Sequence, residues 1–506
     1  MTEVLYHKEK IIGPKMELHM ASDGLVLVGC DGKESVDYAP LGDITDVAVT
    51  KRGRRACLTV SFGTLRPAWV VQRLPALSAE WAESVINEEL GAHKKRGRAE
   101  YTQRVPLDSL TDSCKAIIAG KDNHAAVDLC DFLLVQGVLH EVSDIHFDPY
   151  SEDVVVRFRL DGVLRDVARL DSSIKPHLTA RLKVISHLAT FRKAIAQEGR
   201  AALKIDGRTV DFRFSALPTI HGEKIAVRVF DPAKSIFEIA DLGMSAKMLA
   251  DFESMLMQPQ GTILLTGPAG SGKTTTMYAA LNFLRENRRN LSSIATVEDP
   301  VEYDLQVVNQ TQVNSASGLT FANALRTVLR QDPEVIMIGE IRDRETADIA
   351  VQAGLTGHLI LSTVHARSAA GVPLRLVDLG VEPYLLTSSL SAVISQRLVR
   401  KVCKSCAGEH TPTSEEVEKL GVGSNEKFYT GRGCAQCGET GYAGRSGVFQ
   451  LVPISQALRE LIMQRCSITE IEAQIERDGT QSLLHDGLAK AKAGITTLEE
   501  LLRVIG

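Results

Sequence analysis

The chain has 506 residues, of which 44% are hydrophobic and 24% are charged, and its formal net charge is −5. This length predicts about three or four domains, and the slightly acidic balance excludes a globally basic, nucleic-acid-binding surface. The charged start MTEVLYHKEK is unlike a signal peptide, and no apolar run reaches about 18 residues, so we expect a cytoplasmic protein that meets a membrane only through partners.

Residues 1–92 are expected to form a β-rich module, because short runs of alternating apolar and polar residues recur there. Two of these runs, DVAVT (46–50) and ACLTVSF (56–62), flank the basic stretch KRGRR. This indicates a hairpin whose tip is either solvated or bound to an anionic partner or lipid surface. Residues 93–122, which begin with HKKRGR (93–98), are predicted to be a linker on composition.

A compact α+β domain is predicted for residues 123–232. It begins with the helix-length segment HAAVDLCDFLLVQGVLHEV, in which apolar residues recur at helical spacing. Strands are expected at 154–160, 209–217 and 223–230. In the last two, basic residues alternate with apolar ones, which predicts Arg213 and Arg228 on polar faces.

After about residue 233, strands alternate with helices, which predicts a parallel sheet covered by helices. The predicted strands are GTILLTG (261–267), VIMIGE (335–340) and LTGHLILSTVHA (355–366). TFANALRTVLRQ (320–331) has the apolar spacing of an amphipathic helix, which the following Asp-Pro pair ends. The fold class is therefore multidomain α/β.

The strongest motif is GPAGSGKTT, which satisfies G-x-x-x-x-G-K-[ST] between a predicted strand and a predicted helix. Its glycines let backbone N–H groups turn toward phosphate oxygens, and the helix N-terminus adds partial positive charge. Lys273 is expected to reach the β- and γ-phosphates, and Thr274 to ligate magnesium. The alternative is a glycine-rich turn that binds nothing. The predicted nucleotide-binding residues are Gly267, Pro268, Ala269, Gly270, Ser271, Gly272, Lys273, Thr274 and Thr275.

Two glutamates are candidates for catalysis. Nucleotide-hydrolysing enzymes usually place aspartate and then glutamate at the end of a buried strand, but here Gly339 occupies the aspartate position before Glu340. Glu298 and Asp299 follow another short apolar run, which we expect to deliver them to the same sheet edge. With Glu340 beside the magnesium, Glu298 can orient or deprotonate the attacking water. Alternatively, Glu298 and Asp299 only cap the turn before Pro300.

His358 and His365 lie seven residues apart on one predicted strand. They are therefore expected on opposite faces, so that at most one can face the nucleotide. A lone buried histidine is more often structural. His365 is the better candidate for a γ-phosphate sensor, because ligands bind at the C-terminal ends of strands in α/β sheets.

Four of the nine cysteines have meaningful spacing: Cys403 and Cys406 form one C-x-x-C, and Cys434 and Cys437 form a second. In a reducing compartment these pairs predict a tetrahedral zinc site with no open coordination position. The gap between the pairs exceeds the common spacing of about 15–20 residues, so a further element is inserted there. His410 is a rival ligand only if one cysteine is disengaged, and four free thiols are the alternative.

The zinc module is expected to cover residues 401–447. A helical segment is predicted for residues 448–506.

Several blocks together resemble the secretion ATPases of type II secretion and type IV pilus assembly, the GspE/PilB group. The resemblance covers about residues 125–450 and includes the phosphate-binding loop. The other matching stretches are SDIHFDP (143–149), VRFRLDGVLR (156–165), TVEDPVEY (296–303), LRQDPEVIMIGEIRDRETADIAVQAGLTGHLILSTVHA (329–366), SQRLVRKVCKSC (395–406) and CAQCGETGYAGRSGVF (434–449).

This resemblance implies a homohexamer whose subunits hold ATP between the α+β domain and a RecA-like P-loop ATPase domain, residues 233–400. It implies that Glu298 belongs to the family's acidic box, that Glu340 is its Walker B glutamate, and that residues 358–365 are its histidine box. A glycine before that glutamate is usual in the family. The implied catalytic arginines, which neutralise charge on the γ-phosphate, are Arg200, Arg213 and Arg228.

The chain departs from the family pattern in two places. RKAIAQEGR (192–200) replaces Arg-Arg-x-Pro-Gln-Asp-Gly-Arg, with Ala196 for proline and Glu198 for aspartate. Residues 366–368, Ala-Arg-Ser, stand where the family usually has Thr-Asn-Asp. Residues 1–120 match no N-terminal module that we can name.

The implied function is ATP hydrolysis that powers assembly of a type IV pilus or a type II secretion pseudopilus. The implied cofactors are ATP, Mg²⁺ and Zn²⁺, and the implied partners are an inner-membrane platform protein and a cytoplasmic-facing adaptor protein. One alternative is a pilus-retraction ATPase, although such proteins generally lack the tetracysteine insert. Others are a RecA-like nucleic-acid translocase, which the net charge disfavours, and a scaffold that binds ATP without hydrolysing it, which the two glutamates disfavour.

Overall fold

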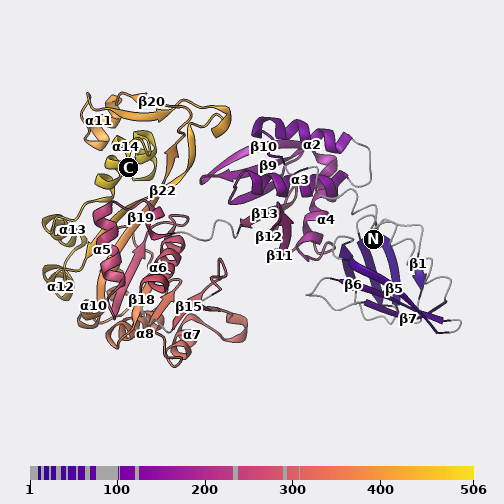
Figure 1. Cartoon of the computed structure of the whole chain (residues 1–506), viewed down its shortest axis with the longest axis horizontal. Coiled ribbons are helices and arrows are strands. Elements are labelled where there is room, and N and C mark those ends of the chain that lie inside the picture. The colour runs from indigo at the N-terminus through magenta and orange to yellow at the C-terminus, as the bar shows by residue number, and fades with distance from the viewer. Residues whose placement is uncertain are drawn as a thin grey trace. The chain divides into compact units, whose positions relative to one another are not determined.

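The computed structural model describes residues 101–505, except for residues 102, 120–124, 232–237, 289–292 and 307, together with the backbone of strands within residues 10–75. By its internal contacts the chain divides into two units, Met1–Asp231 and Pro232–Gly506 (Figure 1). Among the described residues, no helix combines the length and the apolar character that crossing a bilayer requires.

The alternating runs near the N-terminus are strands, as predicted. They form one antiparallel sheet in the order β1-β2-β3-β4 and another in the order β5-β6-β7. The register of β5 and β6 ends at Arg52↔Arg55, which confirms the predicted hairpin. The tip of that hairpin and the stretch HKKRGR lie outside the described residues. The strand bounds are β1 Lys10–Ile12, β2 Met16–Ala21, β3 Gly24–Gly29, β4 Val36–Pro40, β5 Ile44–Arg52, β6 Arg55–Phe62 and β7 Trp69–Pro75.

A six-stranded antiparallel sheet follows in the same unit, in the order β10-β9-β8-β13-β12-β11. Three of these strands, β9, β12 and β13, lie where the sequence predicted them, and the other three were not predicted. The bounds are β8 Asp144–Pro149, β9 Asp153–Leu160, β10 Val163–Asp171, β11 Gln197–Ile205, β12 Arg208–Thr219 and β13 Gly222–Phe230.

Helices α2 (Leu110–Ala119), α3 (Ala125–Leu139) and α4 (Lys175–Ile185) share one hydrophobic core with this sheet. The α3 segment is the predicted helix. The expectation that residues 93–122 are a linker is wrong for α2, because Leu110 and Cys114 are fully buried in that core. The two apolar residues lie four apart and therefore on the same helix face. One such pair is too weak a periodic signal to predict a buried helix in a segment rich in charged residues.

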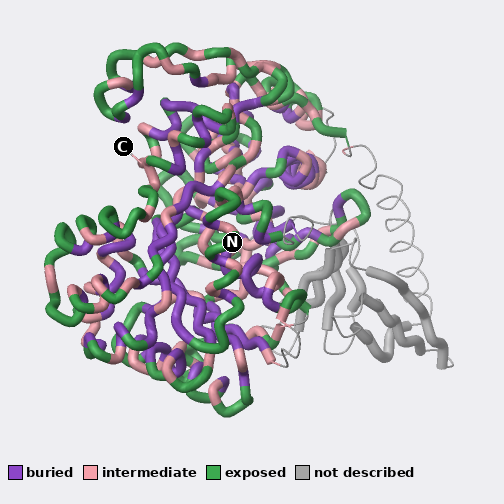
Figure 2. Tube along the Cα trace, turned by 60° about the vertical axis from the view of Figure 1, so that its left-hand side comes forward, coloured by how far each residue is buried: buried purple, intermediate pink, exposed green. Residues whose placement is uncertain are grey.

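The second unit is built on a seven-stranded sheet in the order β16-β15-β17-β18-β14-β19-β22. All neighbouring strands are parallel except β19 and β22, which are antiparallel. Buried residues follow the central strands, whereas exposed residues gather on the outer turns (Figure 2). The bounds are β14 Gly261–Thr266, β15 Ile294–Glu298, β16 Asn309–Gln312, β17 Val335–Ile338, β18 Leu359–Thr363, β19 Leu390–Val402 and β22 Tyr442–Pro453.

Helices cover both faces of this sheet, as strands with continuous apolar runs require. Alternate residues of β14 show this directly: Leu264 belongs to the core shared with α7–α10, α12 and α13, whereas Ile263 and Leu265 belong to the core shared with α5 and α6. The helix bounds are α5 Ala246–Leu256, α6 Lys273–Asn287, α7 Phe321–Val328, α8 Arg344–Leu355, α9 Gly371–Asp378, α10 Pro383–Ser389, α12 Gln456–Met463 and α13 Ile468–Arg477.

The strand predicted over residues 355–366 is shorter than expected. Helix α8 continues through Leu355, and Gly357, with φ 102°, reverses the chain before β18 begins at Leu359. Only glycine adopts such a φ without steric cost. Both histidines of the segment therefore lie outside the strand, so the argument that placed them on opposite strand faces does not apply.

The tetracysteine segment is inserted between the last two strands of the large sheet. β19 runs two residues past the predicted boundary at residue 400, and β22 begins before the predicted boundary at residue 448. Between them lie the small hairpin of β20 (Ala407–His410) and β21 (Phe428–Gly431) and the helix α11 (Ser414–Leu420). This confirms the predicted insertion. Residues 448–453 form part of β22 and are not helical, because they pair with β19.

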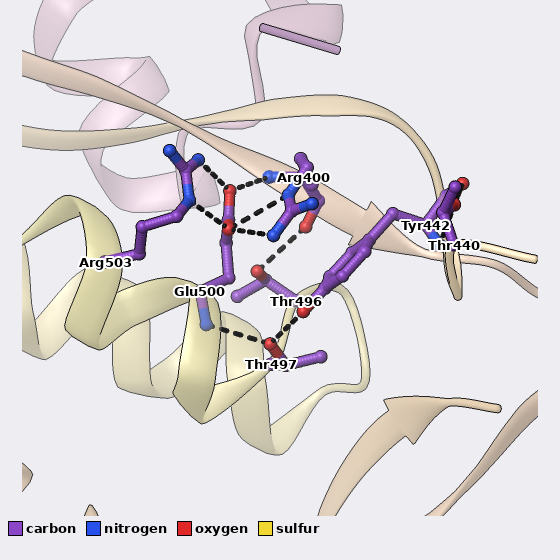
Figure 3. Close-up of polar contacts among 7 residues, drawn as sticks. All are labelled: Arg400, Thr440, Tyr442, Thr496, Thr497, Glu500 and Arg503. Atoms are coloured by element: carbon purple, nitrogen blue, oxygen red, sulfur yellow. Dashed lines mark hydrogen bonds and ion pairs between the residues drawn. The ribbon is translucent and has the colours of Figure 1, made fainter. Parts of the chain in front are cut away.

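The last two helices, α14 (Leu483–Lys492) and α15 (Leu498–Val504), pack on this end of the sheet. Fully buried Glu500 of α15 accepts hydrogen bonds from Arg400 of β19, through Nε at 3.0 Å and Nη2 at 2.8 Å, and from Arg503 (Figure 3). The Arg400 guanidinium also lies 3.9 Å from the ring centre of Tyr442. The buried Glu500 carboxylate therefore links α15 to β19.

Candidate active site

The phosphate-binding loop lies where the motif predicted it, between buried β14 and the first residue of α6. Gly267, Gly270 and Gly272 all have positive φ, at 154°, 73° and 89°. At Gly267 a side chain would also collide with the fold, because a Cβ would lie 2.4 Å from the Gln396 carbonyl oxygen. The loop can therefore keep this conformation only with glycine at these points.

Lys273, the motif lysine, lies folded over the loop. Its Nζ donates to the carbonyl oxygens of Gly267 at 2.8 Å and Pro268 at 3.0 Å. Burial lowers the pKa of Lys273, and the charge of Arg397 lowers it further, whereas Glu340 acts in the opposite direction. The Glu340 carboxylate thus acts on the Lys273 ammonium, as a nearby charge of opposite sign does.

Gln396 of β19 holds the loop by hydrogen bonds and was not predicted as a site residue. Its Nε2 donates to the Ser271 carbonyl at 2.8 Å, and its Oε1 accepts from the Thr276 hydroxyl at 2.9 Å. Gln396 is only 2% exposed. Its neighbours Ser395 and Arg397 are also polar, so no break in an apolar run marks Gln396; its burial shows only in the structure, where a buried polar group needs partners.

Glu298 and Glu340 reach the same edge of the sheet, as predicted. β15 and β17 are parallel neighbours with Val297 opposite Ile338, so Glu298 and Gly339 follow side by side. A Cβ on Gly339 would meet the Glu298 Cα at 3.5 Å, an ordinary contact. The glycine is therefore not forced by lack of space.

The Glu298 carboxylate is 2% exposed and is held by three protein donors. Tyr278 donates to Oε2 at 2.5 Å, and Thr296 and Gln310 donate to Oε1 at 2.5 Å and 3.0 Å. Tyr278 was also missed in the sequence, although it lies four residues after Thr274 on α6 and hence on the same helix face.

Glu340 is more accessible than Glu298, with its side chain 16% exposed. Its Oε1 accepts from Arg342, and its Oε2 lies 3.4 Å from Nε2 of His365. The structure therefore brings His365, which is 62% exposed, next to Glu340.

His358 lies at the opposite end of β18. Its ring Nδ1 is 3.1 Å from the Ala353 carbonyl of α8, and its own carbonyl accepts from the Gly261 amide. These contacts fix the turn between α8 and β18, so His358 has a structural role and does not approach the loop end of the sheet.

The three predicted arginines belong to the first unit, where they form one row. Arg200 pairs with Arg213 across β11 and β12, and Arg213 pairs with Arg228 across β12 and β13. The row continues to Asp144, which accepts from Arg228 at 3.2 Å and from Arg159 at 3.1 Å. Directly opposite residues share a sheet face, so this row carries four arginines and one aspartate. Residues two or four positions along the same strands add acidic groups to the face, among them Glu198, Asp211 and Asp148.

The four motif cysteines converge. Their Sγ atoms all lie within 4.8 Å of one another, and Cys434 and Cys437 are 3.7 Å apart. These separations are too long for disulfides, whose bond is about 2.05 Å. They fit tetrahedral zinc, whose thiolates at about 2.3 Å from the metal are about 3.8 Å from each other.

The surroundings of Cys437 favour a thiolate. Although burial acts in the opposite direction, the backbone N–H groups of Gly441 and Cys434, both 3.2 Å from its Sγ, lower the pKa of Cys437 to about 6. His410 bonds Glu416 instead, at 2.8 Å, so it is not engaged as a rival ligand. Among the described residues, the four cysteines thus form a cluster that could hold a metal ion.

A glycine-rich loop between a buried strand and a helix, with carboxylates ending two neighbouring strands, defines a P-loop nucleoside triphosphatase. The family model described as "Type II/IV secretion system protein" matches residues 120–503, and the chain belongs to this family.

The curated relatives include a protein named Type II secretion system protein E from Aeromonas hydrophila, which is 44% identical over 390 residues, covering 77% of each chain. A protein named Type IV pilus assembly ATPase PilB from Thermus thermophilus is 42% identical over 385 residues, covering 75% of this chain and 43% of that relative. Among solved structures, the Legionella pneumophila ATPase DotB is 19% identical, with a TM-score of 0.56 over 74% of this chain and 94% of that one, which supports the fold. The chain is thus a secretion ATPase by family.

Proposed function

We propose that this protein hydrolyses ATP, as a homohexamer, to power assembly of a type II secretion pseudopilus or a type IV pilus. In this proposal it acts at the cytoplasmic face of the inner membrane through a platform protein and an adaptor protein. The observation that carries the proposal is the pairing of Glu298 and Glu340 at the ends of neighbouring strands, next to a phosphate-binding loop. The names of the relatives in both kinds of machine support it.

The roles within the site follow from chemistry. The loop amides and Lys273 would hold the phosphates, and Thr274 with Glu340 would hold Mg²⁺, which supplies charge neutralisation on the triphosphate. Glu298 would orient or deprotonate the attacking water. Its carboxylate has about four acceptor positions, and the three protein donors leave one of them for that water.

Two further groups would respond to the γ-phosphate. His365 shares Glu340 with Arg342, which supports a place for it beside the proposed Walker B carboxylate. Arg200 and Arg213, together with Arg228, would neutralise charge that develops in the transition state. Their position in one cross-strand row supports this role, because it brings three guanidinium groups to neighbouring places on one sheet face.

We also propose that Cys403, Cys406, Cys434 and Cys437 bind one structural zinc ion. The convergence of their sulfur atoms supports this. Metal analysis of the purified, reduced protein should find about one zinc per chain, and less than about half an equivalent would contradict the proposal.

The catalytic proposal is tested with Glu298→Gln. This variant keeps the size of the side chain but removes its charge, so ATP should still bind while turnover is abolished. Glu416→Gln is the matched control, because Glu416 is also buried and also accepts hydrogen bonds, from Thr413 and His410, but lies in the tetracysteine insertion. Near-normal hydrolysis by the Glu298→Gln variant would remove Glu298 from the mechanism.

A further inference from the structure

The hydroxyl group of Tyr278 joins the phosphate-loop helix to the acidic box. Tyr278 lies one turn of α6 beyond Thr274 and is 3% exposed. Its Oη donates to Oε2 of Glu298 at 2.5 Å and accepts from the Glu302 amide at 3.4 Å. Burial, and then the charge of Glu298, raise the pKa of Tyr278, so the phenol stays protonated and can act only as donor toward the carboxylate.

The other carboxylate oxygen is held from the strands. Thr296 donates to Oε1 from within β15, and Gln310 donates to it from the neighbouring β16. Gln310 also fixes the segment after the acidic box, because its amide bonds the Tyr303 carbonyl at 3.0 Å and the Leu305 amide at 2.7 Å. Among the donors to Glu298 from the described residues, only Tyr278 comes from the helix that begins at the phosphate-binding loop.

We propose that Tyr278 is a positioning residue for hydrolysis: it holds the Glu298 carboxylate in register with α6, so that the one remaining acceptor position points where Thr274 and the loop present the triphosphate. This inference rests on the catalytic role proposed for Glu298. The strand donors bond only Oε1, so without Tyr278 no described protein donor holds Oε2. The Tyr278 bond fixes the second oxygen and with it the direction of the remaining acceptor position.

A purely structural role would have a different signature. If Tyr278 only satisfied a buried acid, its loss would lower stability without a specific effect on the chemical step. Loss of a positioning residue lowers kcat and leaves ATP affinity unchanged. The reason is that the loop and Lys273 would bind the phosphates, whereas Tyr278 bonds Glu298. This loss also moves the pH profile, because a carboxylate that loses a hydrogen-bond donor becomes easier to protonate.

The test is Tyr278→Phe in the full-length protein, with Tyr442→Phe as matched control. Tyr442 is a half-buried tyrosine of the same unit whose hydroxyl bonds Thr497 at 2.9 Å, among the C-terminal helices. Steady-state ATP hydrolysis is measured from pH 5 to 9, and each rate is divided by the number of nucleotide-binding sites, counted with a fluorescent ATP analogue. This division corrects for any unfolded fraction.

For Tyr278→Phe, kcat per site should fall by about 10- to 100-fold, in the range seen when a supporting hydrogen bond is lost behind a reacting group. The affinity for the analogue should stay within about twofold, and the acidic limb of the kcat profile should move to higher pH. Tyr442→Phe should change neither quantity.

An unchanged kcat and an unmoved acidic limb in Tyr278→Phe would overturn the inference, and so would an equal fall of kcat in the control. Failure of the proposed function looks different. In that case the wild-type protein would not hydrolyse ATP, or Glu298→Gln would retain turnover.

Discussion

Replacement of Gln396 by leucine should loosen the phosphate-binding loop. The leucine keeps most of the side-chain volume but leaves the Ser271 carbonyl and the buried Thr276 hydroxyl without the partners that lie at 2.8 Å and 2.9 Å. Each buried polar group left unsatisfied costs about 1–3 kcal/mol, so the two together amount to about 2–6 kcal/mol. A loss of about 1.4 kcal/mol from the nucleotide-binding conformation lowers ATP affinity tenfold. We therefore expect ATP affinity to fall at least tenfold.

The assay is titration with a fluorescent ATP analogue beside urea unfolding of the same samples. Gln136→Leu is the control, because Gln136 is a fully buried glutamine of the first unit that bonds the Val105 amide and the Gln103 carbonyl, both at 2.9 Å. The control should lose stability and keep its affinity. ATP affinity within about twofold of wild type in Gln396→Leu would refute the idea that β19 shapes the loop.

Three further outcomes are expected. Gly339→Ala should fold and hydrolyse ATP within about 0.5 kcal/mol of wild type, as for an ordinary surface change, because a Cβ there meets only ordinary contacts; a large loss in either assay would contradict this. Although burial raises it, hydrogen bonds from Arg503 and Arg400 hold the pKa of Glu500 below its usual 4.5. Its contribution to stability is therefore present above pH 4.5 and lost as the pH falls through the lowered value, so Glu500→Gln should cost about 3 kcal/mol at pH 7 and flatten the acid limb in urea unfolding. Chelation of zinc should expose residues near Cys434 to limited proteolysis, since structural zinc supplies folding energy; unchanged protection would speak against the metal.

Much of the second unit could be predicted because its strands are continuous apolar runs. Such runs reveal the strands that deliver Lys273, Glu298 and Glu340, and the order of parallel strands brings those residues to one edge. The partners of these residues could not be predicted. Tyr278 and Gln396 are buried polar side chains, and what they bond is decided by packing between segments apart in the sequence.

The first unit shows the same limit in a different form. Alternation predicted Arg213 and Arg228 on polar faces, and the observed register adds Arg159 and places Asp144 between two arginines. A pattern along one strand says nothing about which residue of another strand lies opposite. The linker expected at 93–122 failed for a related reason, because the burial of α2 depends on the sheet it meets.

The strand β19 touches the phosphate-binding loop at Gln396, the C-terminal helix at Arg400 and, just past its end, the cysteine cluster at Cys403. An extended chain rises about 3.3 Å per residue, so these three points span about 23 Å of one chain. A single strand thus joins the loop that would hold the nucleotide, the helix at the end of the chain and the cysteines that would hold a metal.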